Sequence, residues 1–328
     1  ESGSITECAG TFDSSNNKVV FAYADSGNSG YGTAVVGTIS GDAITFGSPV
    51  VFESANSQGI RATFDSSNNK DFGNSGYGTA IVGTVSGTSI SFGTATSFHN
   101  AAFVRGAITF DSSNNKVVVG YGDSGNSSYG TARVGTVSGT GISFGTEVVF
   151  NSGGTDEMSA TFDSNNNKVI FTYADDANSG RGSVCSGTVS GTSISFGSQN
   201  AYENGDTLFT AATFDTTTNR IIVAFKDNDD SGKGKIVSME TSGTSVSVTG
   251  NLFVFNDAST DEISIVYDAA ANKIGIAFND AAESSHGRFM YATVSGADIT
   301  LTDEVTFNAA TIDGHIGMAY DSTAERIA

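Results

Sequence analysis

Short apolar runs recur along the chain in groups of four, and each run has about the length of a β-strand. In the first group the runs lie around Cys8 to Phe12, over Lys18 to Ala24, over Thr33 to Ile39 and over Ile44 to Phe52. The second run is apolar on both faces, as in a strand covered from both sides, whereas the fourth begins with strict alternation. No stretch shows the 3.6-residue period of an amphipathic helix. The pattern therefore predicts an all-β protein.

An eight-residue phrase sets the period of this pattern. Thr-Phe-Asp-Ser-Ser-Asn-Asn-Lys at residues 11–18 returns at 63–70 and 109–116, and altered copies occupy 161–168 and 213–220. Its aspartate recurs at Asp13, Asp65, Asp111, Asp163, Asp215, Asp268 and Asp321. A period of about 50 residues with four strands is that of a β-propeller blade. We predict one β-propeller domain of four-stranded blades, with a linear β-solenoid as the alternative.

The copies divide the chain into six full repeats and a partial seventh, at residues 1–52, 53–98, 99–150, 151–204, 205–257, 258–309 and 310–328. A seven-bladed ring would need roughly 30 further residues at this repeat length, so we expect a fragment of a longer array. The second repeat lacks six residues between Lys70 and Asp71. They correspond to the second strand, whose loss would leave its neighbours parallel across a very short link. We therefore interpret Lys70–Asp71 as a gap rather than a native join.

Variation between the copies is confined to one end of the predicted strands. The turns between first and second strands, and the Ser-Gly turns between third and fourth strands, hardly change. In an up-and-down blade these turns share one face of the disc, and the remaining loops share the other. The uniform face is expected to be structural and the variable face to bind.

A variable pair of residues opens each predicted first strand. Small residues follow closely, as suits strands crowded around the axis, so the pair is expected to ring the mouth of the central channel. The predicted ligand-binding members are Glu7, Arg105, Asp156, Glu157, Glu262 and His315. Such a ring forms a polar pocket for a glycan or a cation; the alternative is solvated loop ends in an acidic protein.

A second ring is predicted in the loops between second and third strands. An aromatic or basic residue precedes glycine there in each of six repeats, at Tyr31, Tyr77, Tyr129, Arg181, Lys233 and His286. Such side chains stack on sugar rings or bond to hydroxyls and carboxylates. We predict ligand binding for Tyr31, Tyr77, Tyr129 and Arg181, with tyrosines packed flat on neighbouring strands as the alternative.

No cofactor is predicted, and calcium is the weak metal candidate. Residues 227–232 resemble the first half of a calcium loop, with Asp227, Asp229 and Ser231 as oxygen donors, but the twelfth position lacks glutamate. The histidines form no zinc motif, and His99 and His286 are expected to face water. Paired carboxylates leave a glycosidase as the less favoured alternative to a non-enzymatic protein. Cys8 and Cys185 lie on nearly opposite blades and are expected to be separate thiols.

Charge narrows the range of partners. With 35 acidic and 15 basic residues the chain carries a net charge of −20, which argues against nucleic acid because phosphate contacts require lysine and arginine clusters. The longest apolar runs are about six residues, too short for membrane insertion.

The phrases Thr-Phe-Asp-Ser-Ser-Asn-Asn-Lys-Val-Val and Tyr-Gly-Thr-Ala-Ile-Val-Gly-Thr-Val-Ser-Gly-Thr-Ser-Ile-Ser-Phe-Gly-Thr resemble repeats in long structural proteins of marine phages and marine bacteria, some of them tail-fibre-like. The resemblance covers nearly the whole chain and is strongest over residues 1–200. It implies a virion, extracellular or cell-surface protein that touches host glycans, and it carries over no functional residues. We predict a non-enzymatic module that binds a glycan or a cell-surface receptor. The alternative is a structural or decoration protein that contacts other virion or surface chains without a ligand.

Overall fold

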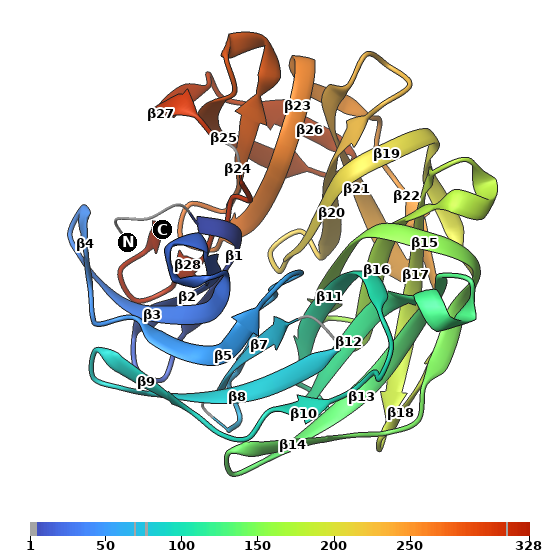
Figure 1. Cartoon of the computed structure of the whole chain (residues 1–328). Coiled ribbons are helices and arrows are strands. Elements are labelled where there is room, and N and C mark those ends of the chain that lie inside the picture. The colour runs from blue at the N-terminus through green and yellow to red at the C-terminus, as the bar shows by residue number, and fades with distance from the viewer. Residues whose placement is uncertain (1–4, 69, 76–77, 313) are drawn as a thin grey trace.

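The computed structural model describes residues 5–68, 70–75 (backbone alone), 78–312 and 314–328. Antiparallel sheets stand radially around a central axis, so the molecule is a β-propeller (Figure 1). The predicted all-β propeller is confirmed. Among the described residues no helix is long and apolar enough to cross a membrane.

Six blades carry the repeat, and a two-stranded hairpin begins the seventh. The first blade consists of β1 (Ile5–Asp13), β2 (Lys18–Asp25), η1 (Ser26–Asn28), β3 (Tyr31–Ser40), β4 (Ala43–Phe46) and β5 (Val50–Asn56). The second consists of β6 (Phe64–Asp65), β7 (Lys70–Ser75), β8 (Thr79–Ser86), β9 (Ser89–Phe92) and β10 (Thr96–Ser97). The third consists of β11 (Phe103–Asp111), β12 (Lys116–Asp123), η2 (Ser124–Asn126), β13 (Tyr129–Ser138) and β14 (Gly141–Phe144). The fourth blade consists of β15 (Val148–Asp163), β16 (Lys168–Asp175), η3 (Asp176–Asn178), β17 (Arg181–Ser190) and β18 (Ser193–Phe196), and the fifth of β19 (Asn200–Asp215), β20 (Arg220–Asp227), β21 (Lys233–Ser242) and β22 (Ser245–Val248). The sixth consists of β23 (Phe253–Asp268), β24 (Lys273–Asp280), η4 (Ala281–Glu283), β25 (His286–Ser295), β26 (Asp298–Leu301) and β27 (Val305–Thr311). The hairpin of the seventh consists of β28 (Tyr320–Asp321) and β29 (Arg326–Ile327).

The outermost strand of each blade is interrupted, although the sequence predicted one continuous strand. In the first blade both β4 and β5 pair with β3, at opposite ends of it. In the third, fourth and fifth blades the second piece continues directly into the innermost strand of the next blade. This produces β15, β19 and β23, each of 16 residues. Consecutive blades are thereby joined through the backbone.

The recurring aspartate holds the turn between first and second strands. Asp163 is completely buried, and its Oδ1 accepts the backbone N–H groups of Asn165 and Asn166 at 3.0 and 2.9 Å. Its Oδ2 accepts Nδ2 of Asn166 at 3.0 Å. The turn ends on Asn167, whose φ of 54° lies in the left-handed region that asparagine tolerates. The aspartate therefore recurs because the turn requires it.

The second blade keeps the antiparallel order with a shortened second strand. β7 pairs antiparallel with both β6 and β8. Residues after Lys70 thus form the second strand, so the parallel neighbours expected from a direct join do not occur. Whether residues are missing between Lys70 and Asp71 stays a prediction.

Apolar side chains fill the spaces between successive blades rather than one central core. One cluster joins the third and fourth blades and includes Val134, Phe150, Phe171 and Tyr173. Equivalent clusters join the first blade to the second, the second to the third, the fourth to the fifth and the fifth to the sixth. Cys8 and Cys185 are both free thiols, as predicted.

Candidate functional site

The innermost strands begin with an irregularity that fixes the channel mouth. Glu7, Glu157, Phe209 and Glu262 have φ between 46 and 54°, and the pairing with the second strand shifts register at each of them. This left-handed conformation is uncommon for residues with a side chain and marks a β-bulge. Three of the four line one cavity, so equivalent bulges direct side chains from different blades to a shared centre.

Arg105 is the basic centre of one side of this mouth. Its Nη2 lies 3.1 Å from Glu157 Oε1, and its Nε lies 3.6 Å from Asp156 Oδ1. The other oxygen of Glu157 accepts the backbone N–H of Phe209 at 2.7 Å. Arg105 comes from β11, Glu157 from β15 and Phe209 from β19, so these contacts connect three blades.

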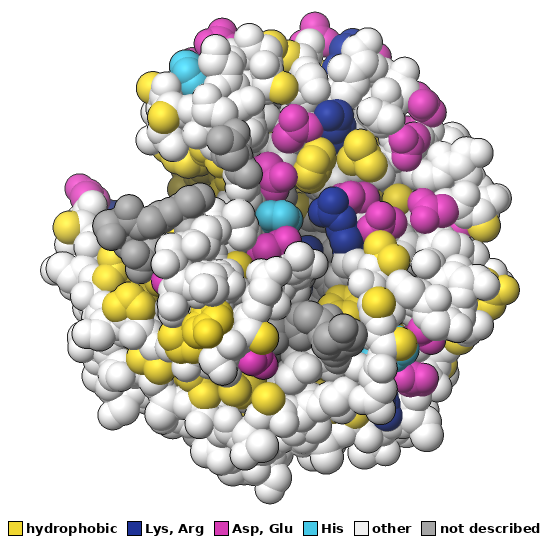
Figure 2. Space-filling view, viewed as in Figure 1, with side chains coloured by type: hydrophobic (Ala, Val, Ile, Leu, Met, Phe, Trp, Pro, Cys, Tyr) yellow, Lys and Arg dark blue, Asp and Glu magenta, His cyan; other side chains and the backbone are white. Residues whose placement is uncertain are grey.

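His315 connects the opposite side. Its Nε2 lies 3.8 Å from Glu7 Oε2 and its Nδ1 lies 3.7 Å from Glu262 Oε2. The structure therefore brings all six predicted mouth residues into one ring, and Figure 2 shows acidic, basic and histidine side chains around the central hollow. Their role in binding stays a prediction.

A cavity of about 270 Å³ opens in this ring. It is lined by Glu7, Gln58, Gly59, Arg61, Phe103, Arg105 and His315. Below it the channel is narrow and lined by the small residues of the innermost strands, among them Ala9, Ala107, Ser159, Ala211, Ser264 and Gly317. The cavity is thus a shallow cup at the top of the channel.

Arg61 and Phe103 are members of the cup that the predicted site omits. Arg61 replaces a small residue of the innermost strands and lines both the cup and the channel below it. Its Nη1 donates to the carbonyl of Ile60 at 2.9 Å and lies 3.9 Å from Glu7 Oε2. Burial lowers the pKa of its guanidinium. The break in the small-residue pattern at Arg61 is the sequence signal that identifies it.

Burial also changes the titration of Glu157. Desolvation raises the pKa of its carboxyl above the ordinary value of 4.5, and Arg105 together with the Phe209 N–H offsets part of that rise. The carboxylate remains bonded to both partners, so protonation removes a contact that holds the mouth ring together.

The second predicted ring lies on the same face but outside the mouth. Tyr31, Tyr129 and Arg181 are the first residues of their third strands rather than loop residues. Each pairs with the aspartate that ends the second strand, and Arg181 Nη2 lies 3.8 Å from Asp175 Oδ2. None of the three lines the cup. Tyr77 lies outside the described residues.

The calcium candidate contains a lysine where a cation would bind. Lys235 Nζ lies 2.5 Å from Asp227 Oδ2 and 2.9 Å from Asp230 Oδ2. The other oxygen of Asp227 accepts backbone N–H groups of the turn, and Asp229 Oδ2 accepts the N–H of Asp206. An ammonium group thus already neutralises these carboxylates, which argues against calcium at Asp227, Asp229 and Ser231.

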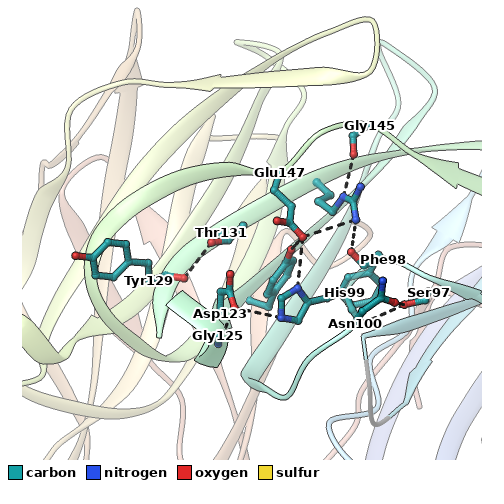
Figure 3. Close-up of polar contacts among 12 residues, drawn as sticks. Ser97, Phe98, His99, Asn100, Asp123, Gly125, Tyr129, Thr131, Gly145 and Glu147 are labelled. Carbon is teal, nitrogen blue, oxygen red and sulfur yellow. Dashed lines mark hydrogen bonds and ion pairs between the residues drawn. The ribbon is translucent and has the colours of Figure 1, made fainter. Parts of the chain in front are cut away.

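His99 is buried, contrary to the expectation that it faces water. It is 8% exposed, and its Nε2 and Nδ1 lie 3.2 and 3.4 Å from carboxylate oxygens of Asp123 and Glu147 (Figure 3). The Tyr121 hydroxyl donates to Glu147 at 3.0 Å. Among the described residues, His99, Asp123 and Glu147 are the group of histidine and carboxylate side chains that lie close enough together to hold a metal ion. Both ring nitrogens face carboxylates, so the imidazole bridges them instead of leaving a shared ligand position.

The same position in the next repeat shows that this contact is structural. Asn151 occupies the place of His99, and its Nδ2 lies 3.0 Å from Thr155 Oγ1 and 3.4 Å from Asp175 Oδ1. The side chain at this position therefore secures the outer strand to the loop after the second strand. Aligning His99 with Asn151 is the sequence signal that could have shown this.

Comparison with protein-family models and with curated proteins finds no match. Solved structures do resemble the chain. The BP39L lectin from Burkholderia pseudomallei is 12% identical with a TM-score of 0.67, over 96% of this chain and 88% of the lectin. A protein from Lactobacillus plantarum is 9% identical with a TM-score of 0.65, over 94% and 86% of the two chains. The SapL1 lectin in complex with α-methyl fucoside is 13% identical with a TM-score of 0.56, over 94% and 97%. The chain therefore shares its overall fold with these proteins.

Proposed function

We propose that this protein is a non-enzymatic carbohydrate-binding module and that its glycan site is the cup at the channel mouth. The observation that carries the proposal is the cup itself. It places guanidinium, amide, imidazole and carboxylate groups beside one aromatic ring in a cavity of about 270 Å³. Sugar hydroxyls need such paired donors and acceptors, and the apolar face of a sugar ring packs on an aromatic side chain.

Two further observations support it. Two of the structurally similar proteins are described as lectins, and one of them was solved with α-methyl fucoside. Both oxygens of Glu157 are already bonded, which suits an acceptor that positions a ligand better than an acid that transfers a proton. The resemblance of the repeats to phage and bacterial surface proteins favours a virion or cell-surface location, where the partner would be a host glycan.

Replacing Arg105 tests the site directly. We expect Arg105→Ala to weaken glycan binding by at least about tenfold, since it removes one of the two guanidinium groups of the cup and leaves Glu157 without its ion pair. The measurement is a glycan-array screen of the wild type, followed by calorimetric titration of both proteins with the best ligand. Arg181→Ala is the matched control, since this arginine has comparable exposure on the same face but lies outside the cup.

Several results would contradict the proposal. Equal loss in the two variants would move the site to the outer ring, and unchanged binding in Arg105→Ala would remove the cup. Absence of any glycan ligand, or turnover of one, would contradict the function.

Binding should also depend on pH through Glu157. The pKa of Glu157 is raised above the ordinary 4.5, so its carboxylate becomes protonated at a pH at which an ordinary glutamate is still ionised. We expect affinity to fall as the pH is lowered from 7 toward 5, and this fall to be reduced in Glu157→Gln. His315 is the imidazole of the cup, so His315→Gln is measured in parallel. An equally steep profile in Glu157→Gln would assign the dependence to another group.

A further inference from the structure

Two arginines from neighbouring blades line the cup together. Arg61 precedes β6 of the second blade, and Arg105 lies in β11 of the third. The lining thus holds two guanidinium groups and the imidazole of His315 against one carboxylate, that of Glu7. Figure 2 shows lysine and arginine side chains gathered beside the central hollow. In a chain with 35 acidic and 15 basic residues, this balance sets the cup apart from the rest of the protein.

The guanidinium of Arg61 has few partners within the protein. Its Nη1 donates to the Ile60 carbonyl at 2.9 Å, which is its one hydrogen bond to the residues that the structure describes. The nearest carboxylate oxygen, on Glu7, lies 3.9 Å away, beyond hydrogen-bond distance, and Glu7 also faces His315 at 3.8 Å. Because a guanidinium carries several N–H donors in one plane, most of those of Arg61 stay available to a ligand in the cup.

Arg105 places a second positive charge near the first. The pKa of the Arg61 guanidinium is lowered, first by burial and also by the charge of Arg105, while Glu7 raises it. Arg105 itself is shared between Glu157 and Asp156, at 3.1 and 3.6 Å. Two guanidinium groups that repel each other in a partly desolvated cavity are stabilised by an anion that contacts both.

A glycine opens the cup beside an aromatic ring. Gly59 stands where the other repeats place a large side chain in the mouth ring: Glu7, Arg105, Glu157, Phe209, Glu262 and His315. A Cβ on Gly59 would lie 4.0 Å from the ring of Phe103, so any side chain there would lie against that ring. The centroid of the Phe103 ring is 6.0 Å from that of Phe98 and 6.1 Å from that of Tyr121, and this packing holds it in place. The cup therefore has an accessible aromatic wall of fixed orientation.

We propose that the cup binds an acidic sugar, a uronic or sialic acid, with its carboxylate on Arg61 and Arg105 and its ring against Phe103. The inference rests on the glycan-binding function proposed above and names the ligand class of that site. Planar guanidinium groups match the two oxygens of a carboxylate. Gln58 and Glu7 are left to bond to the sugar hydroxyls. A neutral sugar would leave Arg61 without an anion within hydrogen-bond distance.

The test compares acidic glycans with neutral glycans that have the same ring. The full chain is screened on an array that carries uronosides, sialosides, their carboxyl-reduced counterparts and sulfated glycans. The best acidic ligand and its reduced counterpart are then titrated by calorimetry at pH 7. We expect the acidic glycan to bind at least about tenfold more tightly, because its carboxylate accepts charge-assisted hydrogen bonds that an alcohol makes only weakly. This comparison uses the wild type alone, so it does not depend on how a substitution affects folding.

Substitutions then locate the preference. Arg61→Gln should bring the ratio of the two affinities close to one, since the amide keeps a polar group without the charge. Arg61→Lys keeps the charge without the planar fork and should give an intermediate ratio. Arg181→Gln is the matched control, because it removes the same charge outside the cup and should leave the ratio unchanged. Thermal midpoints from circular dichroism verify that each variant is folded.

The outcomes separate this inference from the proposed function. Neutral glycans that bind the wild type as tightly as the acidic ones would overturn the acidic ligand and leave the glycan-binding function standing. Failure to bind any glycan would contradict that function, and the inference with it. A preference for sulfated glycans would overturn the carboxylate. An equal change of the ratio in Arg181→Gln would attribute the preference to the overall charge of the protein and overturn the role of Arg61.

Discussion

Gly145→Ala should lower the free energy of unfolding by at least about 3 kcal/mol. The substitution removes no interaction and acts only by adding a methyl group. A Cβ on Gly145 would overlap the backbone carbonyl oxygen of Thr192 in the next blade. The Gly145 N–H also donates to Val134 O at 2.9 Å, so the glycine is held on both sides. The blades would have to separate to admit the methyl group. Urea unfolding, followed by far-ultraviolet circular dichroism, measures this loss of stability.

Gly141→Ala is the matched control in the same blade. The nearest atom to a Cβ there is 3.7 Å away, and its φ is not positive, so the added methyl group meets ordinary van der Waals contact. We expect a change within about 0.5 kcal/mol. Equal destabilisation by the two substitutions would show that glycine serves chain conformation here and not the approach of the neighbouring blade.

Asp163→Ala should cost about 3 kcal/mol, because it removes a buried carboxylate that accepts three hydrogen bonds and leaves two backbone N–H groups without their acceptor. Asp163→Asn retains an acceptor oxygen and should cost less. Asp303→Ala, at an exposed position, should change stability by less than about 0.5 kcal/mol. Thermal and urea unfolding of the three variants measure these values. A neutral Asp163→Ala would mean that the recurring aspartate serves something other than its turn.

The fold could be predicted because each blade repeats its local signals. The spacing of the aspartates, the Gly-containing turns and the four apolar runs agree in every full repeat except the shortened second one, so the copies support one another. The interruption of the outer strand could not be predicted, since it depends on how Gly47 and its counterparts approach the next blade. The pairing of the residues after Lys70 could not be predicted, because it depends on backbone hydrogen bonds to β8 that the alignment of the repeats does not contain.

The site was predictable in position but not in composition. Counting back from the recurring aspartate locates Glu7, Glu157 and Glu262, since every innermost strand starts alike. The sequence spacing does not predict the β-bulge at these residues, and it is the bulge that directs their side chains to the centre of the ring. The cup also needs Arg61 and Phe103, which vary from their counterparts and become neighbours only when the ring forms. Lys235 beside Asp227 lies beyond the six-residue phrase that suggested calcium.

Backbone hydrogen bonding divides the disc into unequal arcs. The strands from β11 to β27 form one 17-stranded sheet, whereas the first and second blades are separate five-stranded sheets. A displacement of any blade in the long arc must pull its neighbours through the main chain. Among the residues that line the cup, Phe103 and Arg105 belong to that continuous sheet, while Glu7 and Arg61 lie on the two separately paired blades. One wall of the cup is thus tied to its neighbours through the main chain and the other only through side-chain packing, so we expect any adjustment to the proposed glycan to occur in the first two blades.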